Sequence, residues 1–255
     1  MFTKIEFCWR WFATAFSFFV FGVGGITLSI VAFPILRCLP VTAVRRAFLA
    51  KRLIHLIFRF YIEMMRFLGV LTYQTKHLER LHNAKLVLAN HPSLIDVVFL
   101  IALIPNANCV VKGKLTRNIF TRGPIKMAGY IINEENENVI ELAREAIAEH
   151  DALIVFPEGT RSVPNEPITL KRGASQIALR VPADITPVII QSFPSTLTKQ
   201  DRWYQIPKTR VHFTLEVKPV ISVQPYISDM RLPVAARRLS SDLAEFFNEE
   251  LQLNV

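Results

Sequence analysis

Cysteine is scarce in this sequence, and the few that occur exclude two kinds of structural support. Only three are present in 255 residues, Cys8, Cys38 and Cys109, and they lie far apart. An odd, scattered set provides neither a disulfide framework nor the paired spacing of a metal site, so we expect reduced thiols and no metal. Cys109 lies in the apolar run Asn108–Val111, which is typical of a buried strand, so we do not expect it to be a catalytic nucleophile.

Acidic residues are also in short supply relative to basic ones. The chain has 21 Asp and Glu against 30 Lys and Arg, which gives a formal net charge of +9. This excess favours a polyanion or an anionic membrane surface as the partner. No zinc-finger spacing, basic zipper or aromatic RNA-binding signature is present, so we expect no nucleic acid. Hydrophobic residues make up 51% of the chain, which favours the membrane surface.

No charged residue occurs between Arg10 and Arg37, a run of 26 residues. As a straight helix this run would be about 39 Å long, enough to cross the hydrocarbon core of a bilayer. It is too long for the apolar region of a signal peptide, and no small-residue cleavage site follows it. Glycines and a proline interrupt the run, so a clean span and a bent or re-entrant helix pair are both open. These residues are Gly22, Gly24, Gly25 and Pro34.

The residues that follow the uncharged run are strongly basic. From Arg37 to Arg66 the chain has seven basic residues and one acid, Glu63. A basic flank of this kind stays on the cytoplasmic side of a membrane and is attracted to an anionic leaflet. We therefore expect a membrane anchor with a basic collar at residues 1–52 and a catalytic domain at 53–255. We expect its active site at the cytoplasmic face of a bacterial inner membrane.

Short apolar runs alternate with amphipathic ones after residue 73. Such alternation predicts an α/β fold, here a layered domain with a central mixed sheet flanked by helices. The predicted strands are 84–89, 108–111, 152–156, 185–190 and 211–217, and the predicted helices are 92–102, 138–149, 176–180 and 233–253. The apolar stretch 53–73 fits either a helix in the membrane interface or a helix packed on the catalytic domain.

A histidine and an aspartate lie close together after the first predicted strand. Residues 90–96 read Asn-His-Pro-Ser-Leu-Ile-Asp, and Pro92 is expected in the first turn of a helix. With His91 outside that helix and Asp96 one turn inside it, the carboxylate can reach back to the imidazole. A carboxylate in this place fixes the histidine tautomer and stabilises the imidazolium, as in hydrolase triads. A purely structural histidine would give the same spacing, so the pair alone is a weak signal.

A second polar block follows the strand predicted at 152–156. Residues 156–162 read Phe-Pro-Glu-Gly-Thr-Arg-Ser. Gly159 allows close backbone approach, Glu158 can orient a cation or a hydroxyl, and Arg161 offers a planar fork to a phosphate. An ordinary turn with a solvated arginine is the alternative. Between the two blocks, an acid-free stretch suits an anionic ligand through five basic residues, Lys112, Lys114, Arg117, Arg122 and Lys126.

In this order the blocks resemble the motifs of the lysophospholipid acyltransferase family, which includes 1-acylglycerol-3-phosphate acyltransferases. Residues 90–96 match the family's His-x4-Asp motif, and residues 156–162 match its Phe-Pro-Glu-Gly-Thr-Arg-Ser motif at every position. Residues 171–174, which we expect to begin a basic turn, and Pro187 are similar to two further motifs, so the resemblance covers about residues 74–220. It implies that the domain at 53–255 is a glycerolipid acyltransferase domain.

One motif departs from the family pattern. It begins at Lys112 and continues through Gly123 and Gly129, but Asn133 and Glu134 stand where the family commonly ends in an arginine. One expected phosphate-contacting cation is therefore missing. The departure leaves 1-acyl-glycerol-3-phosphate as the favoured acceptor and another lipid, such as an aryl polyene, as the alternative.

The resemblance implies direct acyl transfer from acyl-CoA or acyl carrier protein to the hydroxyl of a lysophospholipid, without an acyl-enzyme. The thioester carrier is a co-substrate, and no bound cofactor or metal is implied. His91 would be the general base, oriented by Asp96. The implied substrate contacts are Lys112, Glu158, Gly159, Thr160 and Arg161. A hydrolase is disfavoured because the Gly-x-Ser-x-Gly nucleophile elbow is absent. A catalytically silent lipid-binding protein is the other alternative, against which the intact His91–Asp96 pair argues.

Overall fold

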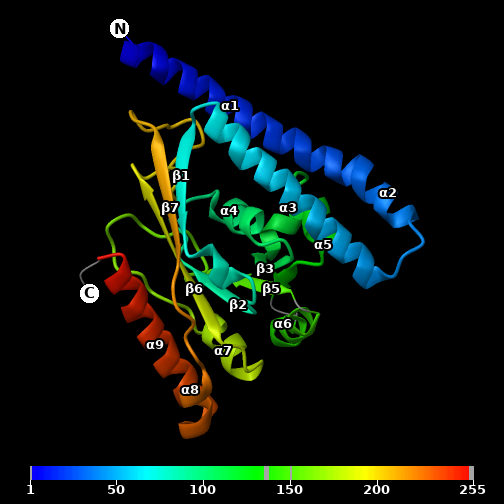
Figure 1. The fold of residues 1–255 in the computed structure, drawn as a ribbon, viewed down its shortest axis with the longest axis vertical. Helices are drawn as coiled ribbons and strands as arrows, with labels where there is room; N and C mark the ends of the chain where they lie inside the picture. Colours follow the sequence, from blue (N-terminus) through cyan, green and yellow to red (C-terminus); the bar gives the residue numbers. More distant parts are fainter. Residues whose placement is uncertain (1, 135–137, 150, 253–255) are drawn as a thin grey trace.

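The computed structural model describes residues 2–134, 138–149 and 151–252. Within them seven strands form one mixed sheet in the order β1-β7-β6-β2-β5-β3-β4, which confirms the predicted α/β architecture (Figure 1). Neighbouring strands are parallel except β6 and β7. The strands are β1 (Leu71–Lys76), β2 (Leu86–Ala89), β3 (Ala107–Lys112), β4 (Ile131–Asn133), β5 (Ala152–Val155), β6 (Ile185–Phe193) and β7 (Val211–Val217).

Helices cover both faces of this sheet, because the central strands are apolar on both sides. Successive strand side chains point to opposite faces, so Val87 packs into one core cluster and Leu86 and Leu88 into the other. The first cluster lies under α1 (Phe2–Thr27), α3 (Ala43–Phe67), α4 (Asp96–Leu103) and α5 (Arg122–Ala128). The second lies under α6 (Val139–Ala148), α7 (Arg172–Arg180), α8 (Gln224–Asp229) and α9 (Leu232–Glu250).

The uncharged N-terminal run forms one continuous helix. A π-helical turn at Leu28–Ala32 joins α1 to α2 (Phe33–Cys38), directly before Pro34, whose missing N–H interrupts regular helical bonding. The stretch Lys4–Cys38 is long and apolar enough to cross a membrane, with a mean hydropathy of 2.2 in its most apolar window. Only 11% of that window is buried, so most of its apolar side chains face outward.

Helix α3 lies beside α1 and packs on the catalytic domain, which is one of the two placements expected for residues 53–73 (Figure 1). Ile54 and Ile62 are buried, whereas Phe60 on the outer side is 69% exposed. The buried Lys51 pairs with Asp151, directly before β5, and links the helix to the sheet. This helix also runs without interruption across the predicted domain boundary between residues 52 and 53.

Several predicted boundaries are wrong, for local reasons. The helix predicted at 92–102 begins only at Asp96, because the Asp96 carboxylate accepts the Ser93 N–H and holds residues 92–95 in a turn. Residues 171–174, taken as a turn, include the start of α7 at Arg172. Strands β1 and β4 were not predicted, since β1 is a polar edge strand and β4 has three residues. Helix α9 occupies 232–250, and position 253 of the predicted tail helix lies outside the described residues.

Candidate active site

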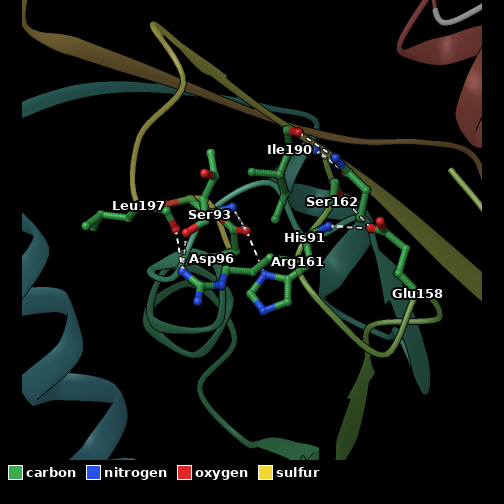
Figure 2. A network of polar contacts seen from close by, with 10 residues as sticks. His91, Ser93, Asp96, Glu158, Arg161, Ser162, Ile190 and Leu197 are labelled. Atoms are coloured by element: carbon green, nitrogen blue, oxygen red, sulfur yellow. Dashed lines mark hydrogen bonds and ion pairs between the residues drawn. The ribbon is translucent and has the colours of Figure 1, made fainter. Parts of the chain in front are cut away.

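The two predicted blocks meet at one edge of the sheet. His91 follows β2, Glu158 and Arg161 follow β5, and these two strands are parallel neighbours in the sheet. Because the carboxyl ends of parallel strands lie at the same edge, the loops that leave them are adjacent. Figure 2 shows the side chains of both loops turned toward one another.

The centre of the site is the pair of His91 and Asp96. Nδ1 of His91 lies 2.8 Å from Oδ2 of Asp96, the contact that the spacing predicts (Figure 2). The same oxygen accepts the Ser93 N–H at 2.6 Å. Asp96 is fully buried, and this burial raises the pKa of its carboxyl, while the bonds from His91 and Ser93 act in the opposite direction. A carboxylate held in this way favours a proton on Nδ1 of the imidazole, which leaves Nε2 as the basic nitrogen.

The imidazole of His91 is held on its face as well as at its edge. Its ring stacks on Phe156, with centroids 4.2 Å apart and an interplanar angle of 25°. The His91 side chain is 19% exposed, so the ring is fixed yet accessible. This combination of a locked orientation and an open nitrogen suits a group that exchanges protons with a bound ligand.

Glu158 connects the two loops rather than facing open space. Its Oε1 accepts the backbone N–H of His91 at 2.9 Å and the hydroxyl of Ser162 at 2.9 Å (Figure 2). In return the Ser162 N–H donates to the His91 carbonyl at 2.8 Å. Burial raises the pKa of Glu158, although both hydrogen bonds oppose this shift. The predicted contact between Glu158 and the acceptor stays a prediction, and the carboxylate is already bonded at one oxygen.

Arg161 reaches across the site to a different segment. Its Nη1 donates to the carbonyls of Leu197 and Thr198, both at 2.7 Å. Leu197 also accepts the N–H of Leu94 at 3.1 Å, so the chain after β6 is fastened over the His91 loop. The planar fork expected to face a phosphate therefore has one nitrogen engaged with protein carbonyls.

Positive charges gather around this edge of the sheet. Lys112 ends β3, and its pKa is lowered by burial first and then by the charges of Lys171, Lys199 and Arg161. Gly159 has a φ of +66°, and a Cβ there would lie 3.3 Å from the Lys171 Nζ, so the glycine leaves room for this lysine. Among the described residues no carboxylate lies within ion-pair distance of Lys112, Lys171 or Lys199. Cations that repel one another without acidic partners favour a bound anion.

The departure from the family pattern lies beside Lys112. Asn133 is the register partner of Lys112 across the β3–β4 pair. The side chain of Glu134 packs over Gly113, where a Cβ would lie 1.9 Å from Oε1 of Glu134. An amide and a carboxylate therefore occupy the place of the expected arginine, and they add no cation to this side of the site.

Thr160 is partly exposed in the loop after β5, close to the other predicted contacts. Asn90 was quoted in the motif but given no role, and its amide exchanges two bonds of 2.7 Å with the backbone of Ile190. This exchange joins the residue that follows β2 to the interior of β6, and the position of Asn90 directly before His91 was the available signal. Lys199 gave no such signal, because its position depends on tertiary contacts of Arg161.

Cys109 is buried in β3, and burial raises its pKa to about 12, as expected for a core thiol.

Comparisons with known proteins relate this fold and site to the acyltransferases. Residues 69–191 match the family model described as Acyltransferase, which confirms the resemblance for this part of the chain. Similar curated proteins include a 1-acyl-sn-glycerol-3-phosphate acyltransferase of Helicobacter pylori, 31% identical over 114 residues, which are 42% of this chain and 48% of that protein. Another is the human 1-acyl-sn-glycerol-3-phosphate acyltransferase beta, 23% identical over 160 residues, 58% of this chain and 56% of that protein.

The aligned regions thus span about half the length of these curated relatives. A solved structure, the 1-acyl-sn-glycerophosphate acyltransferase PlsC of Thermotoga maritima, superposes with a TM-score of 0.71. The superposition covers 99% of both chains at 19% sequence identity, so the two proteins share a fold from end to end.

Proposed function

We propose that this protein transfers a fatty acyl group from an acyl thioester to the free hydroxyl of a lysophospholipid. The proposed acceptor is 1-acyl-glycerol-3-phosphate, which would give phosphatidate. The observation that carries the proposal is the His91–Asp96 contact of 2.8 Å beside Lys112, a cation without a carboxylate partner among the described residues. The curated relatives, named for the same acceptor, support this choice.

In the proposed reaction, Nε2 of His91 accepts the hydroxyl proton while the hydroxyl oxygen attacks the thioester carbonyl. Collapse of the tetrahedral intermediate breaks the carbon–sulfur bond, and the imidazolium returns the proton to the departing thiolate. The products are an ester and a free thiol, and no acyl-enzyme forms. Asp96 keeps the proton on Nδ1 and stabilises the imidazolium. General-base assistance of this kind contributes roughly 10²–10⁴ in rate.

The substrates are positioned by the residues around this pair. Lys112 supplies a cation to the acceptor phosphate, and Arg161 adds positive charge to the same side of the site. Gly159 and Thr160 form the turn directly before Arg161. Glu158 fixes the His91 loop by accepting the His91 backbone N–H. The donor is acyl-CoA or acyl carrier protein, a co-substrate, and the reaction needs no resident cofactor or metal.

The location follows from the N-terminal helix and the acceptor. A lysophospholipid resides in a membrane, and the stretch Lys4–Cys38 exposes most of its apolar side chains. We propose that this helix inserts in a bacterial inner membrane and that the basic residues after it contact the anionic cytoplasmic leaflet. The active site would then face the cytoplasm, with lipid rather than nucleic acid as partner.

A different lipid acceptor, such as an aryl polyene, is the second candidate. It is favoured by one observation, the carboxylate of Glu134 at the place of the family's arginine. A silent lipid-binding protein is the third, and it has no use for a histidine whose tautomer is fixed by a buried carboxylate.

The deciding experiment offers the purified chain an acyl thioester and a panel of lysolipids, with His91→Ala as the control, and weighs the products by mass spectrometry. Acyl gain on lysophosphatidate that disappears in the control supports the proposal. Histidine-dependent transfer to another acceptor alone keeps the chemistry and replaces the substrate. Binding of lipid without any acyl transfer refutes the proposed enzymatic activity.

A further inference from the structure

The chain between β6 and β7 contributes a segment to the active site that lies outside the family's motifs. Residues 194–201, here the 194–201 segment, leave the end of β6 and pass over the His91 loop. The carbonyls of Leu197 and Thr198 accept both bonds from Nη1 of Arg161, and Leu197 also accepts the Leu94 N–H. Figure 2 shows Leu197 beside Arg161 and Ser93. Three bonds thus fix this segment against the loops that carry His91 and Arg161.

The fastened carbonyls lie directly before Lys199. Thr198 is buried and its N–H donates to the Asp201 carboxylate at 2.9 Å, so the residue directly before Lys199 is held at both its N–H and its carbonyl. The Lys199 side chain itself is exposed, and no carboxylate of the described chain lies within ion-pair distance of it. A long cationic side chain on an anchored backbone, without an acidic partner, is available to a ligand.

Lys199 also acts on the part of the site where the family's arginine is missing. Its charge acts on Lys112, the residue whose register partner is Asn133. Next to them the Glu134 carboxylate packs over Gly113, where the family commonly has an arginine. Lys199, from the 194–201 segment, can therefore supply near Lys112 the positive charge that the missing arginine after β4 would have supplied.

We propose that Lys199 is a specificity-determining residue that binds the acceptor phosphate, and that Arg161 positions it by fastening the 194–201 segment. This inference rests on the proposed function, since it takes a phosphate-bearing lysolipid as the acceptor. It gives Arg161 a second role besides its charge, namely to fix the segment in place through two carbonyls.

The first test compares Lys199→Gln with Lys85→Gln, using lysophosphatidate and an acyl thioester. Lys85 is exposed and precedes β2, so it lies at the opposite end of that strand from His91. Its substitution removes the same charge far from the site. We expect Lys199→Gln to raise the KM for lysophosphatidate about tenfold, the loss of one charged contact, with little change in kcat. Lys85→Gln should leave both unchanged, and Lys199→Arg should restore the KM.

The second test asks whether Arg161 acts through the segment. Arg161→Lys keeps the charge but loses the planar fork, so it should raise the KM like Lys199→Gln, and the double variant should be no worse than either. Hydrogen exchange at residues 196–199 should become faster in Arg161→Lys.

Three results would overturn the assignment. They are an unchanged KM in Lys199→Gln, an equal loss in Lys85→Gln, and multiplicative losses in the double variant. Failure of the unmodified chain to acylate lysophosphatidate is a separate outcome, which refutes the proposed function and this inference with it.

Discussion

Replacing Asp96 with asparagine tests how the proposed base is set up, because the two side chains have nearly the same shape. Asp96 Oδ2 contacts Nδ1 of His91 at 2.8 Å and the Ser93 N–H at 2.6 Å, while Oδ1 is buried and has no hydrogen-bond partner among the described residues. If the new amide NH₂ faces His91, the ring proton moves to Nε2 and the base is lost. If its oxygen faces His91, the tautomer survives but the imidazolium loses its counter-charge.

Either orientation removes most of the general-base contribution, which is roughly 10²–10⁴ in rate. At about 1.36 kcal/mol for each factor of ten, the barrier rises by about 2.7–5.4 kcal/mol. Stability should change less, since two effects oppose each other. An unpaired buried amide costs about 1–3 kcal/mol, and removing a carboxylate whose pKa is raised by burial offsets part of that cost.

The assay follows thiol release from the acyl thioester in the presence of lysophosphatidate, for Asp96→Asn, His91→Ala and the double variant, with unfolding temperatures measured in parallel. Residues that act as one unit are not additive, so the double variant should be as slow as His91→Ala alone. The reasoning is refuted if Asp96→Asn keeps more than a tenth of the rate. It is equally refuted if Asp96→Asn slows the His91→Ala protein by its full factor.

Three further predictions concern groups held inside the fold. Burial raises the pKa of Glu158 above its usual 4.5, so the folded state binds more protons and stability is lost as pH rises through the folded pKa. As pH rises above about 4.5, the unfolding temperature of the unmodified chain should therefore fall relative to that of Glu158→Gln. Parallel plots of unfolding temperature against pH for the two proteins would contradict this. Lys51→Met leaves Asp151 charged and buried, which should cost about 3–5 kcal/mol of unfolding free energy, whereas replacing both by apolar residues should recover most of it. A loss below about 1 kcal/mol in a denaturant titration would show the pair to be unimportant. A thiol reagent should modify the two exposed cysteines of the native protein and reach Cys109, whose burial raises its pKa to about 12, only after unfolding. Modification of all three in the native state would disprove that.

The parts of the fold that were predictable are those where burial determines the sequence pattern. Strands β2, β5 and the first part of β6 are apolar on both faces because helices cover both, and continuous apolar runs marked them. Strand β1 reads Leu-Thr-Tyr-Gln-Thr-Lys, since an edge strand with one exposed side needs little apolar surface, and it was missed. The start of α4 was misplaced because a carboxylate bond to Ser93, rather than Pro92, determines where the helix begins.

The site was predictable to the extent that its contacts are local. His91 and Asp96 are five residues apart, and their contact follows from a strand that ends and a helix that begins. The bond from Arg161 to Leu197 joins residues 36 positions apart, and no local pattern indicates where that segment folds. The cation contributed by Lys199 therefore depends on tertiary structure alone.

The link between Glu158 and the His91 backbone has a consequence for protein engineering. Each of the two loops holds the other through an exchanged pair of bonds, from His91 N–H to Glu158 and from Ser162 N–H to His91. A chimera that takes residues 84–105 from another acyltransferase but keeps residues 152–166 would combine two loops whose exchanged hydrogen bonds come from different proteins. The two blocks should therefore be transplanted as a single module, together or not at all.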